Sequence, residues 1–444
     1  MRCFSLHMCA TYVFLSYIGK LAAEGWTLKS VPWFIDQTIG GAVSTCTHGS
    51  SLKFGSISQQ LLAIRVMLSN ATIATITREE YGDTIFDAFR CNVGQLGITL
   101  AVTLEVIKES SAQRINEEVS SDKMLREIEA ASDIITKCKA NVKDEDEDWF
   151  NSCAMKSKEV QKLDDSSYFY FVPTSDSRRV QIRRNEEFSN ELTDDERKAR
   201  SAILLKTIKG RNDDDSNVPR NLNEFLFQVT PSKSTSSVND PDTTRNRFMQ
   251  NDRLSITWTN LWKNALENSI ESVTSTNASK AYLTMTERQL DRNDNFPMEQ
   301  NEVSIDLADA GRCLRYFMES IERPNFYRSP ILIRFLSAES ALLSPSNGRA
   351  SMYVNIENFK TSQEGIKAYD DAIKLLVSSS QCNGRLHFGK FGWLDGLENG
   401  YYSIYEKYGN AYCKFLKVRD MFEESRMFQT DAMRKVSELK NHCA

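Results

Sequence analysis

The sequence predicts an α+β protein made of two successive units. Residues 38–107 contain apolar runs in the order strand, strand, helix, strand. From about residue 330 onward, short apolar strands alternate with amphipathic helical segments, which is typical of a mixed sheet with helices on one face. At 444 residues the chain is long enough for two large domains or about three average ones.

The first unit begins with a predicted hairpin. Residues 61–68 form a mostly apolar run of strand length, and residues 71–76 return as its partner. Thr77 and Glu80 form a capping-box pattern, so a helix is expected to follow. Residues 98–106 then alternate apolar and polar side chains, which predicts a half-buried strand.

The middle of the chain is more polar. Residues 110–165 carry Glu and Lys at helix-like spacing and include an acidic run at 143–148, so we expect a solvated surface helix and loop. Residues 186–255 are polar and turn-rich, which predicts a largely flexible insertion inside the second unit. A helix is expected again at residues 257–266.

The last third of the chain regains regular patterns. We expect strands at residues 330–336 and 351–356 and a helix at residues 365–378. The final apolar segment, which includes Met421 and Phe428, is expected to pack back on the first unit.

Charge and cysteine usage exclude several classes. The formal net charge is −5, which favours neither a nucleic acid nor an anionic membrane surface as a partner. The ten cysteines form no C-x-x-C pair and only four histidines are present, which argues against a zinc site; we predict no metal. The cysteine spacing also argues against a dense disulfide scaffold, so reduced cysteines are expected.

The N-terminal segment, residues 1–20, leaves two interpretations open. Its apolar run is shorter than the about 20 residues that span a bilayer. It could be the core of a signal peptide or an amphipathic helix that leads into Gly25. Asn70 and Asn277 begin glycosylation sequons, but such triplets often arise by chance, so the compartment stays open.

Residues 38–51, TIGGAVSTCTHGSS, are the most informative stretch. Glycines let backbone N–H groups approach a ligand closely, and small hydroxyls can donate hydrogen bonds to a phosphate or a heteroaromatic ring. A plain tight turn is the commoner explanation for two adjacent glycines. The length of this run and its Thr-His-Gly-Ser-Ser ending favour a binding segment.

Four further motifs accompany this run in a fixed order, at residues 21–28, 94–99, 168–176 and 386–390. With them the chain resembles the vanillyl-alcohol-oxidase-type flavoproteins, specifically the aldonolactone oxidases that make ascorbate and its analogues. The resemblance covers roughly residues 21–107 and, more loosely, residues 168–428.

This resemblance implies a truncated PCMH-type FAD-binding domain at residues 21–109. An aldonolactone-oxidase-type substrate domain with a mixed or antiparallel sheet and helices would follow at residues 110–444. The family's pyrophosphate loop precedes the segment that matches here, so we expect the 444-residue chain to bind FAD weakly or not at all. The resemblance also favours a helix over a signal peptide before Gly25.

The implied activity is FAD-dependent oxidation of a gulono-, galactono- or arabinono-1,4-lactone to an ascorbate-type product, with dioxygen becoming hydrogen peroxide. A dehydrogenase that uses another acceptor and a non-catalytic truncated paralogue are the alternatives. The implied partners are the sugar lactone and dioxygen, without nucleic acid but with peripheral association with a membrane. By the same resemblance, the endomembrane system or ER and the mitochondrial membrane are the expected locations.

The resemblance assigns hydroxyl, glycine and neighbouring residues to the flavin. They are Thr38, Gly40, Gly41, Ser44, Thr45, Thr47, His48, Gly49, Gly97 and Ile98.

Lys390 matches the lysine of the family's His-Trp-x-Lys motif, with Phe388 in place of Trp, and is implied to be catalytic and to hold the substrate. A solvated surface lysine would be the default without the motif. His387 is implied to lie at the substrate, although a structural histidine is the stronger interpretation. Trp33 is placed beside the substrate too. Pro32 stands where relatives carry Gly in oxidases or Ala in dehydrogenases, so the electron acceptor stays open.

Arg334 matches the arginine of the family's Glu-x-Arg pair, but Leu332 occupies the Glu position. Residues two apart on a strand share a face, and a buried arginine needs a partner. Glu357, on the neighbouring predicted strand, could supply the missing acid, so Arg334 and Glu357 are predicted to be catalytic and substrate-binding. Alternatively, Glu357 pairs with a surface lysine.

Overall fold

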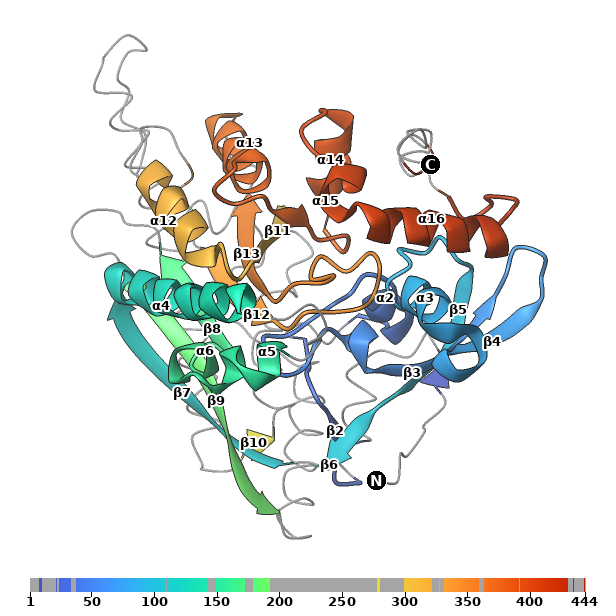
Figure 1. Ribbon diagram of the computed structural model, residues 1–444, viewed down its shortest axis with the longest axis horizontal. Coiled ribbons are helices and arrows are strands. Elements are labelled where there is room, and N and C mark those ends of the chain that lie inside the picture. Colours follow the sequence, from blue (N-terminus) through green and yellow to red (C-terminus); the bar gives the residue numbers. More distant parts are fainter. Residues whose placement is uncertain are drawn as a thin grey trace, which may run out of the picture.

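The structure is a computed structural model. It describes residues 8–9, 21, 24–32, 37–108, 110–141, 149–171, 179–191, 278–279, 299–321, 327, 331–358, 363–390, 392–429, 434 and 443. Two units lie side by side, a smaller one near the N-terminus and a larger one built on a broad sheet (Figure 1).

The smaller unit is a four-stranded sheet in the order β1–β5–β3–β4, in which every pair is antiparallel. Two helices pack on it, and two short strands form a separate ribbon beside it. The elements are β1 (Met8–Cys9), β2 (Trp26–Leu28), α2 (Ile39–Ser44), η1 (Ile57–Gln60), β3 (Leu61–Met67), β4 (Ile73–Thr77), α3 (Arg78–Arg90), β5 (Ile98–Leu104) and β6 (Val106–Lys108).

The predicted strand–strand–helix–strand order in this unit is confirmed. The side-chain oxygen of Thr77 accepts from the backbone N–H of Glu80 at 3.2 Å and so caps α3, as the capping pattern predicts. Apolar side chains of β3 and α3, including Ile64, Val66 and Phe89, are buried between the sheet and the helix.

The larger unit is an eight-stranded sheet in the order β10–β7–β9–β8–β12–β13–β11–β14, again antiparallel throughout. Its strands are β7 (Ser110–Ser120), β8 (Ser166–Phe171), β9 (Arg179–Glu191), β10 (Ala278–Ser279), β11 (Glu299–Asp306), β12 (Ile331–Leu336), β13 (Ser351–Asn358) and β14 (Arg385–Leu386). Its helices are α4 (Ser121–Ala140), α5 (Trp149–Ser152), η2 (Ala154–Lys156), α6 (Lys158–Gln161), α12 (Ala310–Ile321), α13 (Gln363–Ser378), α14 (Gly392–Glu398), α15 (Ile404–Tyr408) and α16 (Asn410–Phe422).

The two faces of this sheet differ in chemistry. One face carries Ile333 and Val354 and packs under the neighbouring helices α4, α12 and α13 (Figure 1). The other face carries Arg334 opposite Tyr353, and Glu302 opposite Asn355. Because strand side chains alternate, the polar residues all point away from the helices and toward the smaller unit.

The expected C-terminal packing is confirmed for Phe422, whereas Met421 is 67% exposed. Helix α16 lies against α3, where the rings of Phe422 and Phe89 meet edge to face with centroids 5.2 Å apart. The expected strands near residues 330 and 351 and the helix near residue 365 are also present. In the part of the chain that the structure describes, no helix combines the length and apolarity that a membrane crossing requires.

Two expectations for the middle of the chain are wrong. Strand β7 occupies the first eleven residues of the segment expected to be helix and loop, and α4 buries an apolar stripe that includes Met124 and Ile128. Strand β9 continues through Glu191, past the expected start of the insertion at residue 186. The rest of that insertion, the acidic run at 143–148 and the expected helix at 257–266 lie outside the described residues.

The expectation of reduced cysteines is also wrong. Eight of the ten cysteines form four disulfides, Cys46–Cys91, Cys138–Cys153, Cys313–Cys382 and Cys413–Cys443. The paired residues lie between 15 and 69 positions apart in the sequence. Only the fold brings them together, so local cysteine spacing could not reveal the pairing.

Candidate functional site

The loop at residues 46–51 crosses from the smaller unit onto the end of β12. Ser51 forms a parallel bridge with Leu336, and the backbone N–H of Phe335 donates to the hydroxyl of Ser50 at 3.1 Å. Gly49 lets the loop pack closely against Val31 on its other side, because a Cβ there would lie 2.4 Å from the carbonyl oxygen of Val31. The loop therefore fixes His48 against the polar face of the large sheet.

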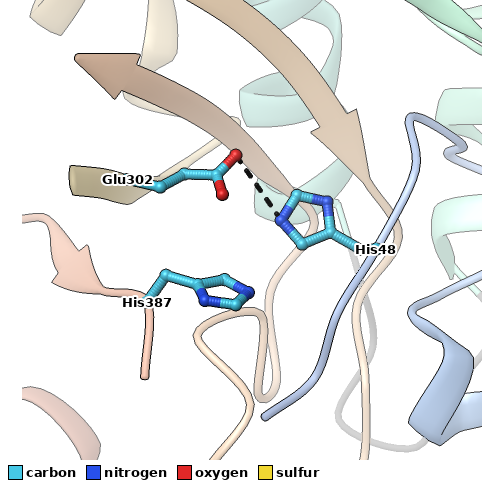
Figure 2. Close-up of side chains that lie close together, drawn as sticks. All are labelled: His48, Glu302 and His387. Carbon is cyan, nitrogen blue, oxygen red and sulfur yellow. Dashed lines mark ion pairs between the residues drawn. The ribbon is translucent and has the colours of Figure 1, made fainter. Parts of the chain in front are cut away.

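A buried charged cluster occupies this junction. Arg334 forms an ion pair with Glu302 and donates from Nη1 to the carbonyl oxygen of His48 at 3.1 Å. His48 Nε2 lies 3.6 Å from Glu302 Oε1, the contact that Figure 2 marks with a dashed line. The exposed fractions are 8% for Arg334, 1% for Glu302 and 3% for His48, so the cluster is closed to solvent.

Backbone groups orient the rings of the two histidines. His387 Nδ1 accepts from the backbone N–H of Gly389 at 2.9 Å, so its Nε2 carries the proton and faces the carbonyl oxygen of Cys46 at 3.3 Å. His48 Nδ1 lies 2.8 Å from the carbonyl oxygen of Gly49 while its Nε2 faces Glu302. Both nitrogens of His48 thus lie near oxygen atoms, Nδ1 at hydrogen-bond distance and Nε2 at 3.6 Å.

The charges shift the pKa values in the cluster. Burial acts to raise the pKa of Glu302, but Arg334, His48 and His387 together hold that pKa well below its usual value. Burial lowers the pKa of His387 to about 3, against the opposing effect of Glu302. At neutral pH Glu302 is therefore ionised and His387 is neutral.

The side chains of His48, Glu302 and His387 are grouped as metal ligands would be, with their ligand atoms within 4.8 Å of one another (Figure 2). Two features make them a poor cation site. The guanidinium group of Arg334 already neutralises the Glu302 carboxylate. Each ring nitrogen of His387 already faces a backbone hydrogen-bonding group. We therefore interpret the cluster as a charge network that joins the two units.

A half-exposed polar strip lies next to this cluster. The hydroxyls of Thr45 and Thr47 are 3.4 Å apart, and Thr47 donates to Gln37 Oε1 at 3.2 Å. A Cβ on the exposed Gly389 would come within 3.3 Å of the Thr45 hydroxyl, so the two loops touch. The ammonium group of Lys390, the next residue, donates to Gln300 Oε1 at 2.8 Å, which brings strand β11 into the strip.

The strip includes three of the predicted site residues, Thr45, Thr47 and Lys390. The other predicted residues of the 38–51 segment lie close by in the chain. Thr38 is exposed and caps α2 by accepting from the backbone N–H of Gly41, which is exposed too, while Gly40 is buried. The carbonyl oxygen of half-buried Ser44 accepts from the backbone N–H of Val93.

Gly97 and Ile98 belong to the start of β5. Gly97 has φ +110°, and a Cβ there would meet the carbonyl oxygen of Met67 at 2.6 Å, so this glycine has a structural reason of its own. Ile98 pairs with Met67 and points to the outer face of the small sheet, away from α3. The structure does not bring these two residues into the strip.

The carboxylate that pairs with Arg334 is Glu302, which sequence reasoning did not select. Glu357 lies opposite Gln300 in the β11–β13 pairing, and Gln300 in turn accepts a hydrogen bond from Lys390. The side chain of Glu357 and the whole of Trp33 lie outside the described residues. The alternation of Glu302 with apolar Val303 and Ile305 was the available signal, because it predicts a strand with Glu302 on its polar face.

The strip has the chemistry that a flavin ring requires. Two hydroxyls, a carboxamide and an ammonium group stand at the surface around a glycine without a side chain. These groups can hydrogen-bond to ring nitrogens and carbonyls, and the glycine leaves room for a flat ring. The residues present therefore fit the ring end of FAD.

Comparison with known proteins finds relatives among the lactone oxidases. A family model described as D-arabinono-1,4-lactone oxidase matches residues 226–436. The D-arabinono-1,4-lactone oxidase of Yarrowia lipolytica is 28% identical over 107 residues, which is 24% of this chain and 20% of that protein. The L-gulonolactone oxidase of Mus musculus is 29% identical over 90 residues, 20% of each chain. The match thus spans about a fifth of the length of these curated relatives.

Solved structures show the same architecture. A crystal structure of cholesterol oxidase from B. sterolicum superimposes with a TM-score of 0.58 at 11% identity, covering 98% of this chain and 81% of that one. A structure titled solvent-stable cholesterol oxidase gives a TM-score of 0.59 at 11% identity, covering 97% and 81%. These likenesses concern the fold alone, an α+β architecture with helices and antiparallel sheets. The family model and these curated relatives show that parts of this chain are similar to the aldonolactone oxidases.

Proposed function

We propose that this chain oxidises an aldono-1,4-lactone, of the gulono-, galactono- or arabinono- type, with FAD as cofactor and dioxygen as electron acceptor. One observation supports this most directly. The Thr45 hydroxyl from the smaller unit lies beside Gly389 of the larger unit, and the next residue, Lys390, donates to Gln300. A cofactor seated on the smaller unit and a substrate held by the larger unit would meet there.

The chain's residues would divide the work of binding. Thr45, Thr47 and Gln37 would hydrogen-bond to the ring of FAD, and Gly389 would leave room for it. FAD, when bound, supplies the capacity to accept a hydride from the carbinol carbon of the lactone.

Lys390 is the residue we propose to be catalytic. Its ammonium group is half-exposed and is oriented by Gln300, so it can contact a bound lactone and place a positive charge where negative charge develops. Arg334, Glu302 and His387 are buried beneath the strip and bonded to protein groups, so we propose that they position the loops rather than touch the lactone.

Replacement of Lys390 tests this proposal. Lys390→Ala should lower lactone turnover by about 100-fold or more, with an unchanged unfolding midpoint. Lys367→Ala is the matched control, because Lys367 is an exposed lysine on α13 that pairs with Asp371 in the same helix. Equal turnover of the two variants would remove Lys390 from the site.

The electron acceptor needs a separate measurement. With dioxygen as acceptor, each lactone oxidised yields one hydrogen peroxide. Lactone-dependent reduction of cytochrome c without peroxide would establish the dehydrogenase alternative. Failure of the 444-residue chain to turn over lactone even with excess FAD would contradict the proposed function for this chain.

A further inference from the structure

The turn between β3 and β4 carries the sequence Asn70-Ala71-Thr72, an acceptor triplet for N-linked glycosylation. All three residues are exposed. The triplet lies at the tip of the hairpin in the small sheet. The function proposed above does not use this tip.

The hydrogen bonds that Asn70 makes to Thr72 within the turn use its side-chain oxygen and not its amide nitrogen. Asn70 Oδ1 accepts from the backbone N–H of Thr72 at 3.0 Å and from the Thr72 hydroxyl at 2.6 Å. Backbone bonds between Leu68 and residues 71–72 close the hairpin, and Ala71 takes a φ of +63°. Asn70 and Thr72, the two side chains that N-linked glycosylation requires, therefore lie together at an exposed turn.

The disulfides supply an independent observation about the compartment. Four pairs lock segments 15 to 69 residues apart, and such bonds form and persist in oxidising compartments. N-linked glycans are attached in the same secretory environment. The cysteine pairing thus raises the sequon at Asn70 above a chance triplet.

The surface around the turn also suits a covering group. Ile73 and Ile98 pair with Met67 from its two sides, so the three residues form a row on the outer face of the small sheet. The exposed fractions are 52% for Ile73 and 47% for Ile98, which is unusual for isoleucine. A bulky polar glycan at Asn70 would shield this row from contacts with other molecules.

We propose that Asn70 carries an N-linked glycan and that the chain matures in the oxidising lumen of the secretory pathway. In the transfer, the amide nitrogen of Asn70 bonds to the anomeric carbon of a lipid-pyrophosphate-linked oligosaccharide. The lipid pyrophosphate leaves and the amide loses one proton. No oxidant is consumed.

Mass spectrometry tests the proposal on the full chain, expressed in insect cells behind a cleavable secretory leader. Enzymatic deglycosylation in heavy-oxygen water converts a glycosylated asparagine to labelled aspartate. We expect that label at Asn70 in most of the disulfide-bonded protein. An unlabelled Asn70 in secreted, disulfide-bonded protein would overturn the proposal.

Matched variants separate modification from folding. Asn70→Asp keeps an oxygen acceptor for both Thr72 bonds but cannot be glycosylated, so it should lose the glycan with an unchanged unfolding midpoint. Thr72→Ser should keep the glycan, and Asn277→Gln should leave the Asn70 label intact. If Asn70 stays unmodified and the chain sediments with lipid vesicles through Ile73, the row is a membrane contact and the proposal fails.

Discussion

Arg334, Glu302 and His48 are charged or chargeable side chains that are almost completely buried. Removing ions from water costs several kcal/mol each, and a close partner is what makes their burial tolerable. Here one carboxylate serves Arg334 and His48 together. The cluster is therefore a device that fixes how the loop at residues 46–51 meets the large sheet.

Removing the shared carboxylate should be costly. Glu302→Ala leaves Arg334 buried without its ion pair, so we expect the free energy of unfolding to fall by about 3–5 kcal/mol. Urea denaturation measures this. Glu398→Ala, at an exposed glutamate on α14, is the control and should change stability by less than about 0.5 kcal/mol. Similar losses for both variants would show that the cluster does not stabilise the fold.

His387 should make stability depend on pH. Its pKa is about 3 in the folded protein against an ordinary value of 6.5, so between these values the unfolded chain binds a proton that the folded chain does not. The contribution to stability is present above pH 6.5 and is lost as pH falls, at up to about 1.4 kcal/mol per pH unit.

Unfolding measured from pH 8 to pH 5 should show this slope, and His387→Gln should flatten it. Glu302 affects stability at lower pH than His387 does. Its contribution to stability is present above pH 4.5, the ordinary pKa of a glutamate, and is lost as pH falls through the depressed pKa in the folded protein. An unchanged slope in His387→Gln would mean that another group is responsible.

The Cys46–Cys91 disulfide joins the base of the His48 loop to the end of α3. The pair encloses 45 residues, so replacing both cysteines by serine should cost roughly 4 kcal/mol. The variant should also bind FAD less well, because the loop carries Thr45, Thr47 and His48.

The Cys138–Cys153 pair is the matched control. It encloses 15 residues and lies beside α4, on the far side of the sheet from the strip, so its loss should cost roughly 3 kcal/mol without weakening cofactor binding. Equal loss of binding in both double variants would contradict a specific role for Cys46–Cys91.

Sequence patterns predicted the elements better than their pairing. Alternation and caps were enough to predict β3, β4, α3, β12 and β13. Strand β7 was missed because its polar side chains at residues 110–120 lack apolar alternation. Lys390 and Thr45 were selected through motifs and stay predictions. The pairing of Glu302 with Arg334 depends on two strands separated by β13, which no local pattern reveals.

The molecule as a whole is organised around the polar face of the eight-stranded sheet. Helices cover the opposite face, and the smaller unit lies against this one (Figure 1). Hydrogen bonds beyond the His48 loop join the units as well, since Ser340 donates to Asp87 at 2.9 Å and accepts from Arg90 at 3.0 Å. The half-exposed strip is thus formed by both units, and neither contains it alone.

Anaerobic flavin reduction in the full chain tests the proposed function most directly. The purified 444-residue protein is kept with enough free FAD to saturate it and is mixed with L-gulono-1,4-lactone, with D-arabinono-1,4-lactone in a parallel sample, while the visible flavin absorbance is followed. We predict that one of the lactones bleaches the bound flavin, that bleaching is at least about 100-fold slower in Lys390→Ala, and that Lys367→Ala behaves like the unmodified protein. Bound flavin that neither lactone bleaches would contradict the proposed function. Equal bleaching rates in Lys390→Ala and the unmodified protein would contradict the role of Lys390.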